Sequence, residues 1–76
     1  MLSGQSSGTA AVLFRDCRRA LGLSQAELAR RLRVQSDRTI RRWEAAERDI
    51  PGPAWVALGY MLREAKQSEL AETIAR

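Results

Sequence analysis

The spacing of hydrophobic and polar positions divides most of the chain into short amphipathic helices. In the first segment, four apolar residues recur on one helical face: Leu13, Cys17, Ala20 and Leu21. Thr9 is a suitable N-cap and Gly22 can adopt the left-handed conformation that ends a helix, so a helix is predicted from Thr9 to about Leu21. Residues 1–8 are rich in serine and glycine and are predicted to be a flexible arm, which leaves residues 9–76 as the domain.

A second helix is predicted to begin after Ser24. Ser24 and Glu27 have the S-x-x-E spacing of a capping box, in which each side chain accepts a hydrogen bond from the backbone N–H of the other residue. The residues expected on the buried face of this helix are Leu28, Ala29 and Leu32. The chain then breaks at residues 33–35, and Ser36 can cap a third helix over about residues 37–46.

The third helix is predicted to bury Ile40 and Trp43, which are three residues apart. Trp43 is therefore expected to belong to the core, where it cannot stack on a base. The same periodicity leaves three arginines on the exposed side: Arg38, Arg41 and Arg42. Asp37 lies at the edge of that side, in the first turn.

A fourth helix is predicted over about residues 54–65, after a loop that Pro51 and Pro53 keep non-helical. Its inner face is expected to consist of Ala54, Leu58, Met61, Leu62 and Ala65, with Trp55 on the flank. Gly59 inside the helix indicates close approach of another helix. A last helix over residues 69–75 must dock on its own domain or on a second copy, because it has too few apolar residues to be stable alone: Leu70 and Ile74.

Length and charge place this pattern among small basic domains. The 76 residues suffice for one compact all-α domain of four to five helices. Residues 15–48 hold ten arginines and five acidic residues, whereas residues 49–76 hold three basic and four acidic ones. The positive field therefore lies on the first two-thirds of the chain, and arginine favours recognition of phosphate or guanine. A GC-rich genome is the alternative explanation of the arginine content.

Several kinds of site are not expected from the residue types present. Cys17 is the one cysteine and histidine is absent, so neither a disulfide within the chain nor a metal site is predicted, and no cofactor or small-molecule ligand is evident. Cys17 is expected to be a small apolar core residue, with a redox-sensing thiol beside Arg18 as the alternative. No nucleophile–base pair indicates an enzyme. The chain has no signal-peptide pattern and no apolar run that could span a bilayer, so a cytoplasmic location is expected.

Two short helices joined by a tight break, the second of them rich in arginine, form the helix-turn-helix pattern. The most specific segments are GLSQAELA at residues 22–29, SxxTI at 36–40 and WE at 43–44. With IPGPA at 50–54, the chain over roughly residues 10–65 resembles the lambda-repressor-like, or XRE-type, helix-turn-helix regulators of phages and bacteria. The small size and the RRWE…IPGPA arrangement also resemble, less closely, phage autoregulators associated with anti-CRISPR operons.

The sequence departs from that family in the turn between the second and third helices. Arg33 stands where the family usually has glycine, and Gln35 is an extra residue before the cap. The turn is therefore one residue longer and lacks the residue type best suited to a positive φ. The tilt of the third helix depends on how this turn closes.

The resemblance implies a set of contacts with DNA. The implied base contacts are Asp37, Arg38, Arg41 and Arg42, and the implied phosphate contacts are Gln25, Arg30, Gln35, Ser36 and Thr39. Arg38 and Arg42 lie four residues apart on one face, where each can bind a guanine through O6 and N7. Asp37 can accept a hydrogen bond from a cytosine amine, or favour the helix N-terminus by its charge. The resemblance also pairs Arg18 with Glu44 in a structural salt bridge.

The function implied is that of a sequence-specific regulator of transcription that binds double-stranded DNA. The simplest form is a homodimeric repressor on a palindromic operator, with the third helix in the major groove. The dimer surface is expected within residues 54–76, at Trp55, Leu58, Leu70 and Ile74. The alternative is a protein-binding module of the same fold, such as an antitoxin or an adaptor, which would have no need of the arginine face.

Overall fold

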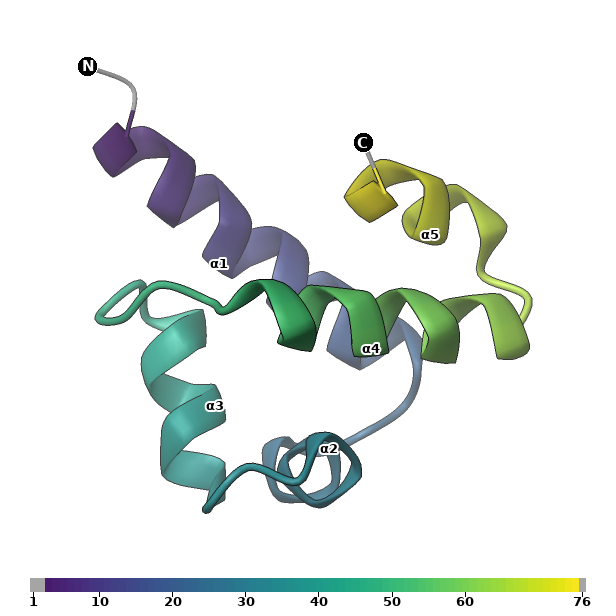
Figure 1. Cartoon of the computed structure of the whole chain (residues 1–76), viewed down its shortest axis with the longest axis horizontal. Helices are drawn as coiled ribbons and strands as arrows, with labels where there is room; N and C mark the ends of the chain where they lie inside the picture. The colour runs from purple at the N-terminus through teal and green to yellow at the C-terminus, as the bar shows by residue number, and fades with distance from the viewer. Residues whose placement is uncertain (1–2, 76) are drawn as a thin grey trace.

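The computed structural model describes the backbone of residues 3–75 and the side chains of residues 8–75, and over that range the chain forms five α-helices and no strand (Figure 1). The predicted all-α fold is confirmed. The helices are α1 (Ser3–Ala20), α2 (Gln25–Leu32), α3 (Asp37–Glu44), α4 (Gly52–Glu64) and α5 (Ser68–Ala75). Helices α2 and α3 lie at the end of the molecule away from α5.

The first helix is longer than predicted. It begins at Ser3, so the predicted start at Thr9 is wrong and residues 3–8 of the predicted arm are helical. No proline stands in this stretch, and adding a residue to an existing helix is much easier than nucleating one. Met1 and Leu2, the other residues of the predicted arm, lie outside the described residues.

The core is centred on Phe14 of α1. Its ring is fully buried and meets the rings of Trp43 and Trp55 edge-on, with centroid distances of 5.6 and 5.5 Å. This geometry matches the ring quadrupoles, and it joins α1 to α3 and to α4. Around it lie the other fully buried side chains: Cys17, Leu28, Ile40, Leu58 and Leu62.

Cys17 is a core residue with an unreactive thiol. Burial, and secondarily the charge of Asp16, raises the pKa of the Cys17 thiol to about 11. Reactive thiols need access and a lowered pKa, and Cys17 has neither. The structure therefore favours the apolar role over the redox-sensing alternative.

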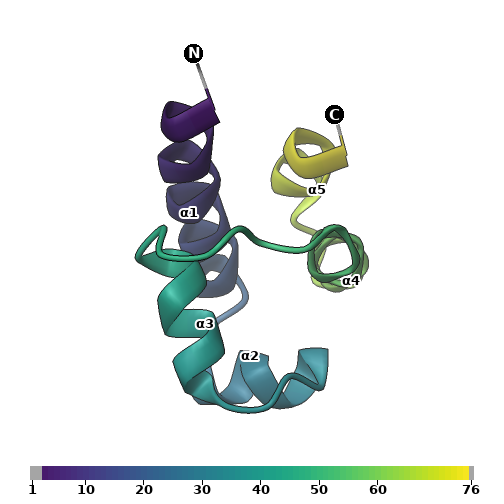
Figure 2. The same cartoon turned by 60° about the vertical axis from the view of Figure 1, so that its left-hand side comes forward.

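Helices α4 and α5 pack against each other, and α5 lies beside α4 in both views (Figures 1 and 2). A Cβ built on Gly59 would lie 3.5 Å from Cδ1 of Ile74, so the close approach that this glycine indicated is provided by α5. The last helix thus docks on its own domain. Ala65, predicted on the inner face of the fourth helix, is exposed because it stands at the C-cap, where the chain leaves α4.

The capping box of α2 forms as predicted. Ser24 Oγ accepts a hydrogen bond from the backbone N–H of Glu27 at 3.0 Å, and Glu27 Oε1 accepts one from the backbone N–H of Ser24 at 2.8 Å. The hydrogen bond from the backbone N–H of Ser24 to the carboxylate, and secondarily the Ser24 side chain, lower the pKa of Glu27 below its ordinary value of 4.5. Because the folded state has the lower pKa, the ionised carboxylate stabilises the fold above pH 4.5, and this contribution is lost as the pH falls through the folded value.

We predict that the Glu27→Gln variant has a free energy of unfolding that depends less on pH. Glutamine can keep the reciprocal hydrogen bond but does not titrate. The wild-type chain should be the more stable above pH 4.5, and the difference should shrink in more acidic buffer. Urea unfolding over a pH series measures it, and a difference independent of pH would contradict the assignment.

Candidate nucleic-acid interface

The turn between α2 and α3 closes without a glycine because Arg33 itself adopts the left-handed conformation, with φ 59° and ψ 36°. Its N–H donates to the carbonyl of Arg30 at 3.2 Å, and the N–H of Val34 donates to the carbonyl of Ala29 at 3.0 Å. This pair of bonds is the Schellman arrangement that ends many helices. Val34 then packs against the core, and the extra residue Gln35 is exposed.

Ser36 begins α3, and its Oγ accepts a hydrogen bond from the N–H of Arg38 at 3.2 Å. One turn later, Nη2 of Arg41 lies 3.0 Å from Oδ2 of Asp37, in an exposed ion pair. Ile40 and Trp43 are buried, so α3 presents its opposite side to solvent. The helix ends at Glu44, two residues before the predicted end, because Ala46 takes a positive φ of 61°.

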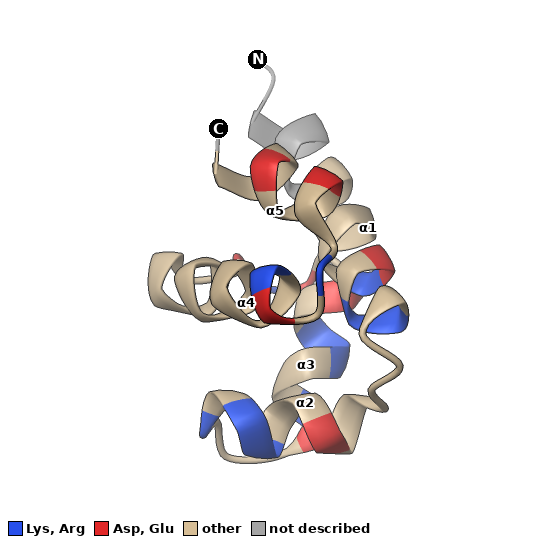
Figure 3. Cartoon of the chain, turned by 90° about the vertical axis from the view of Figure 1, so that its right-hand side faces the viewer, with Lys and Arg blue, Asp and Glu red and all other residues tan. Residues whose placement is uncertain are grey.

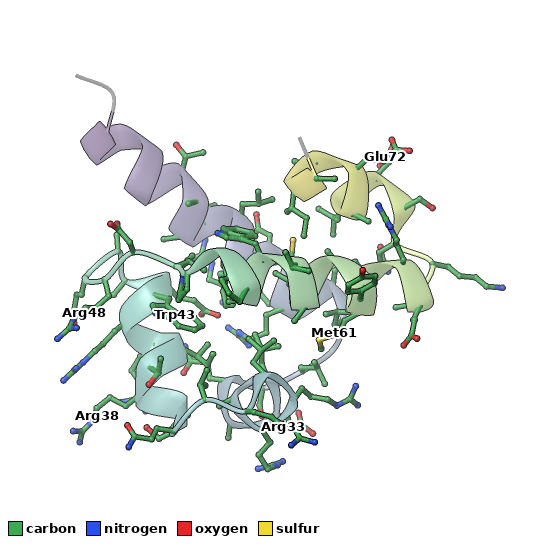
Figure 4. The ribbon with its side chains drawn as sticks, viewed as in Figure 1. Arg33, Arg38, Trp43, Arg48, Met61 and Glu72 are labelled. Atoms are coloured by element: carbon green, nitrogen blue, oxygen red, sulfur yellow. The ribbon has the colours of Figure 1, made fainter. Side chains whose placement is uncertain are left out.

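The exposed side of α3 borders an open depression of about 450 Å³. Its lining contains all four predicted base-contact residues and three of the five predicted phosphate-contact residues: Gln35, Ser36, Asp37, Arg38, Thr39, Arg41 and Arg42. Arg38, Arg41 and Arg42 are exposed, and Figure 4 shows Arg38 extending away from the ribbon at the start of α3. The sequence-predicted reading residues are therefore brought together on one surface.

The two remaining predicted phosphate contacts lie on α2. Arg30 borders a separate depression of about 270 Å³, together with Leu23, Glu27 and Arg31. Gln25 is half-buried, and its Nε2 donates to Oε1 of Glu44 at 3.1 Å. The basic residues gather on α2, α3 and the end of α1, whereas α5 carries acidic ones (Figure 3).

An ion pair between Arg18 and Glu44 ties α3 to the rest of the domain. Nε and Nη2 of Arg18 donate to Oε2 and Oε1 of Glu44 at 2.7 and 3.0 Å, and the two side chains are only 12% and 6% exposed. Nη1 of Arg18 also donates to the carbonyl of Leu23 at 2.9 Å. With Gln25 on the same carboxylate, the network joins the end of α1, the start of α2 and the end of α3.

The residues proposed for a dimer surface have unequal positions. Leu58 is fully buried within the monomer, so it cannot contact a second copy, and its assignment to the dimer surface is corrected. Trp55, Leu70 and Ile74 are half-buried against the core. Trp55 and Ile74 border an apolar groove of about 310 Å³ between α4 and α5, lined also by Val56, Gly59, Tyr60, Arg63, Ala71 and Ala75.

Sequence reasoning missed two exposed large apolar residues of that groove. Val56 and Tyr60 are 60% and 64% exposed, the highest values among the large apolar residues that the structure describes. They lie four residues apart on α4, beside the stripe that faces the core, so the helical spacing could have identified them as a second apolar strip. Among the described residues, no cluster of side chains could hold a metal ion, and no helix is long and apolar enough to cross a membrane.

The model of a family described as "Helix-turn-helix domain" matches residues 10–72, a range that contains α2, α3 and α4 entirely. No curated protein and no solved structure matches the chain.

We predict that Glu44→Gln lowers the free energy of unfolding by about 3 kcal/mol, because it leaves the largely buried guanidinium of Arg18 without its counter-charge. The double variant Arg18→Met, Glu44→Leu should lie within about 1 kcal/mol of wild type, since it removes both charges. Urea unfolding measures all three chains.

The exposed ion pair of α3 provides the matched control. Asp37→Asn removes the charge that pairs with Arg41, and because both side chains are well exposed it should change stability by less than about 1 kcal/mol. A single Glu44→Gln change no more costly than Asp37→Asn would show that the Arg18–Glu44 pair does not hold the fold together.

Proposed function

This chain belongs to the helix-turn-helix domain family of lambda-repressor-like regulators, and from that premise we propose that it is a sequence-specific regulator of transcription that binds double-stranded DNA. One observation carries the proposal: every predicted base-contact residue lines the same open surface on α3. The major groove of B-DNA admits one α-helix, and a helix with arginines on its outer side suits both the groove and its phosphate walls.

In this proposal α3 enters the major groove and its arginines read the bases. Arg38 and Arg42 lie on one exposed face and have no protein partner among the described residues, so each guanidinium is free to bind O6 and N7 of a guanine. Asp37 and Arg41 form an ion pair in the free chain. That pair can fix the direction of Arg41, or open so that Asp37 accepts a hydrogen bond from a cytosine amine.

Backbone phosphates are then bound around the edge of α3 and by α2. Gln35, Ser36 and Thr39 line the depression beside α3, near a helix N-terminus whose dipole favours an anion. Gln25 has one amide N–H held by Glu44 and a second one for a phosphate oxygen. Arg30, exposed on α2, supplies a charge outside the groove.

Two copies on a palindromic operator give the proposed regulator its specificity. A single α3 contacts only a few base pairs, whereas a dimer contacts two half-sites about one helical turn, roughly 34 Å, apart. The groove between α4 and α5 is a suitable surface for self-association, because Val56 and Tyr60 expose apolar area beside Trp55 and Ile74. Repression follows most simply from a dimer that covers a promoter.

The same groove favours a second candidate function. An antitoxin or adaptor of this fold would use the apolar strip of Val56 and Tyr60 to bind a different protein. The arginine face of α3 argues for DNA, since an adaptor has no use for it. Binding to DNA that does not weaken steeply with added salt would favour the adaptor.

We predict that Arg42→Ala and Arg30→Ala weaken DNA binding in different ways. Arg42→Ala should relax base preference at one position of the operator and cost about 1–3 kcal/mol there, because a bidentate contact to guanine is lost. Arg30→Ala should weaken binding to every sequence about equally and lower the salt dependence. Selection from random DNA, followed by titrations at several salt concentrations, measures both. Equal effects of the two changes on all sequences would rule out α3 as the reading helix.

We predict that Tyr60→Glu raises the dimer dissociation constant by about tenfold or more, because it places a charge in the apolar strip. Tyr60 is 64% exposed in the monomer, so the fold should survive the change. Val12→Glu is the matched control, since Val12 is an exposed apolar residue of α1 outside the groove. Sedimentation equilibrium measures the dimer dissociation constant of each chain. Equal weakening by Tyr60→Glu and Val12→Glu would contradict the proposed dimer surface, and so would a wild-type chain that stays monomeric.

A further inference from the structure

Arg33 combines an unfavourable backbone conformation with a side chain that has no role in the fold. Its φ of 59° lies in the left-handed region, which glycine adopts without cost and other residues do not. The side chain is exposed, and within the described part of the chain it makes no hydrogen bond or ion pair. Neither packing nor pairing in the folded chain therefore explains an arginine at this position.

The charges around Arg33 add a second unfavourable contribution. Residues 30–42 contain six arginines and one acidic residue, Asp37, which is already paired with Arg41. Like charges this close repel one another and weaken the folded state. The carbonyl end of α2 offsets part of this for Arg33, because a helix C-terminus favours a cation. A lysine at the end of α4, Lys66, has the same conformation with φ 62°, but its local surroundings are not dominated by one sign of charge.

We propose that Arg33 binds a phosphate of the DNA backbone at the wall of the groove that α3 enters. The inference rests on the DNA-binding function proposed above and adds a contact that neither the sequence pattern nor the family resemblance assigns. Arg33 ends α2, and only Val34 and Gln35 separate it from Ser36, the cap of α3. In Figure 4, Arg33 and Arg38 lie at the same end of the molecule, at the two ends of the turn.

The position of Arg33 favours a phosphate over a base. Arg33 stands in the turn, outside the surface of α3 that collects the reading residues, and it does not line that depression. A side chain beside a helix in the major groove reaches the sugar–phosphate strand first. The six arginines of residues 30–42 favour a polyanion such as DNA as the binding partner. The unfavourable left-handed backbone at Arg33 is then explained by the role of its side chain in binding.

The test compares Arg33→Gly with Lys66→Gly. In both variants glycine relieves the left-handed backbone, which should raise the urea midpoint of unfolding by more than the lost cation at the helix C-terminus lowers it. Lys66 follows directly after α4, and the C-terminal end of α4 lies away from α3 (Figure 1), which makes Lys66 the matched control for binding. Affinity is measured for an operator recovered by selection and for a duplex of unrelated sequence, each at several salt concentrations.

Arg33→Gly should weaken binding to both duplexes about fivefold near physiological salt, and it should reduce the slope of log K against log salt by about 0.9. Lys66→Gly should change neither quantity. Unchanged affinity and slope for Arg33→Gly, or an equal loss in Lys66→Gly, would overturn the proposed contact. A loss confined to the selected operator would also overturn it, because that result identifies a base contact. Failure of the wild-type chain to bind either duplex would refute the proposed function itself, whatever the variants do.

Discussion

The ion pair between Arg18 and Glu44 fastens the end of α3, the helix proposed to bind DNA, to α1 and to the start of α2. The hydrogen-bond network around this pair includes the side chain of Gln25 and the carbonyl of Leu23, so it joins the ends of α1 and α3 to the start of α2. Both charged side chains are almost fully buried. Two ions removed from water are tolerated only when most of their hydrogen-bonding capacity is filled, and here four bonds fill it. Because a buried ion pair adds little net stability over an apolar pair, we infer that the main effect of this network is on the relative orientation of the three helices.

That orientation matters because α3 has little else to hold it. It is eight residues long, too short to be stable in water by itself, and only Ile40 and Trp43 are buried. The edge-on contact of Trp43 with Phe14 anchors the middle of the domain, and Glu44 anchors the end of the helix. The remaining side of α3 is thereby left for arginines, which would destabilise any surface that had to pack.

Much of this arrangement could be predicted from the sequence, because its signals are local. The capping box at Ser24 and Glu27 and the buried spacing of Ile40 and Trp43 depend on neighbours in the chain. The start of α1 depends on cooperative helix growth, which no short window of sequence contains, whereas the burial of Leu58 is already indicated by its place on the predicted inner face of α4. Contact between the exposed strip of Val56 and Tyr60 and another chain is a tertiary property that the local sequence pattern does not predict.

In the turn after α2, backbone hydrogen bonds alone account for the left-handed conformation of Arg33, so the arginine side chain needs a separate explanation. The same pair of backbone hydrogen bonds closes the ends of α1, α2, α3 and α4, around Gly22, Arg33, Ala46 and Lys66. Three of these four residues have a Cβ, so the hydrogen bonds and the packing that follows enforce the left-handed conformation without glycine. Residue identity at such a position is then open to selection for another purpose. Only Arg33 among them lies between α2 and α3, where an added cation meets the surface that DNA would occupy.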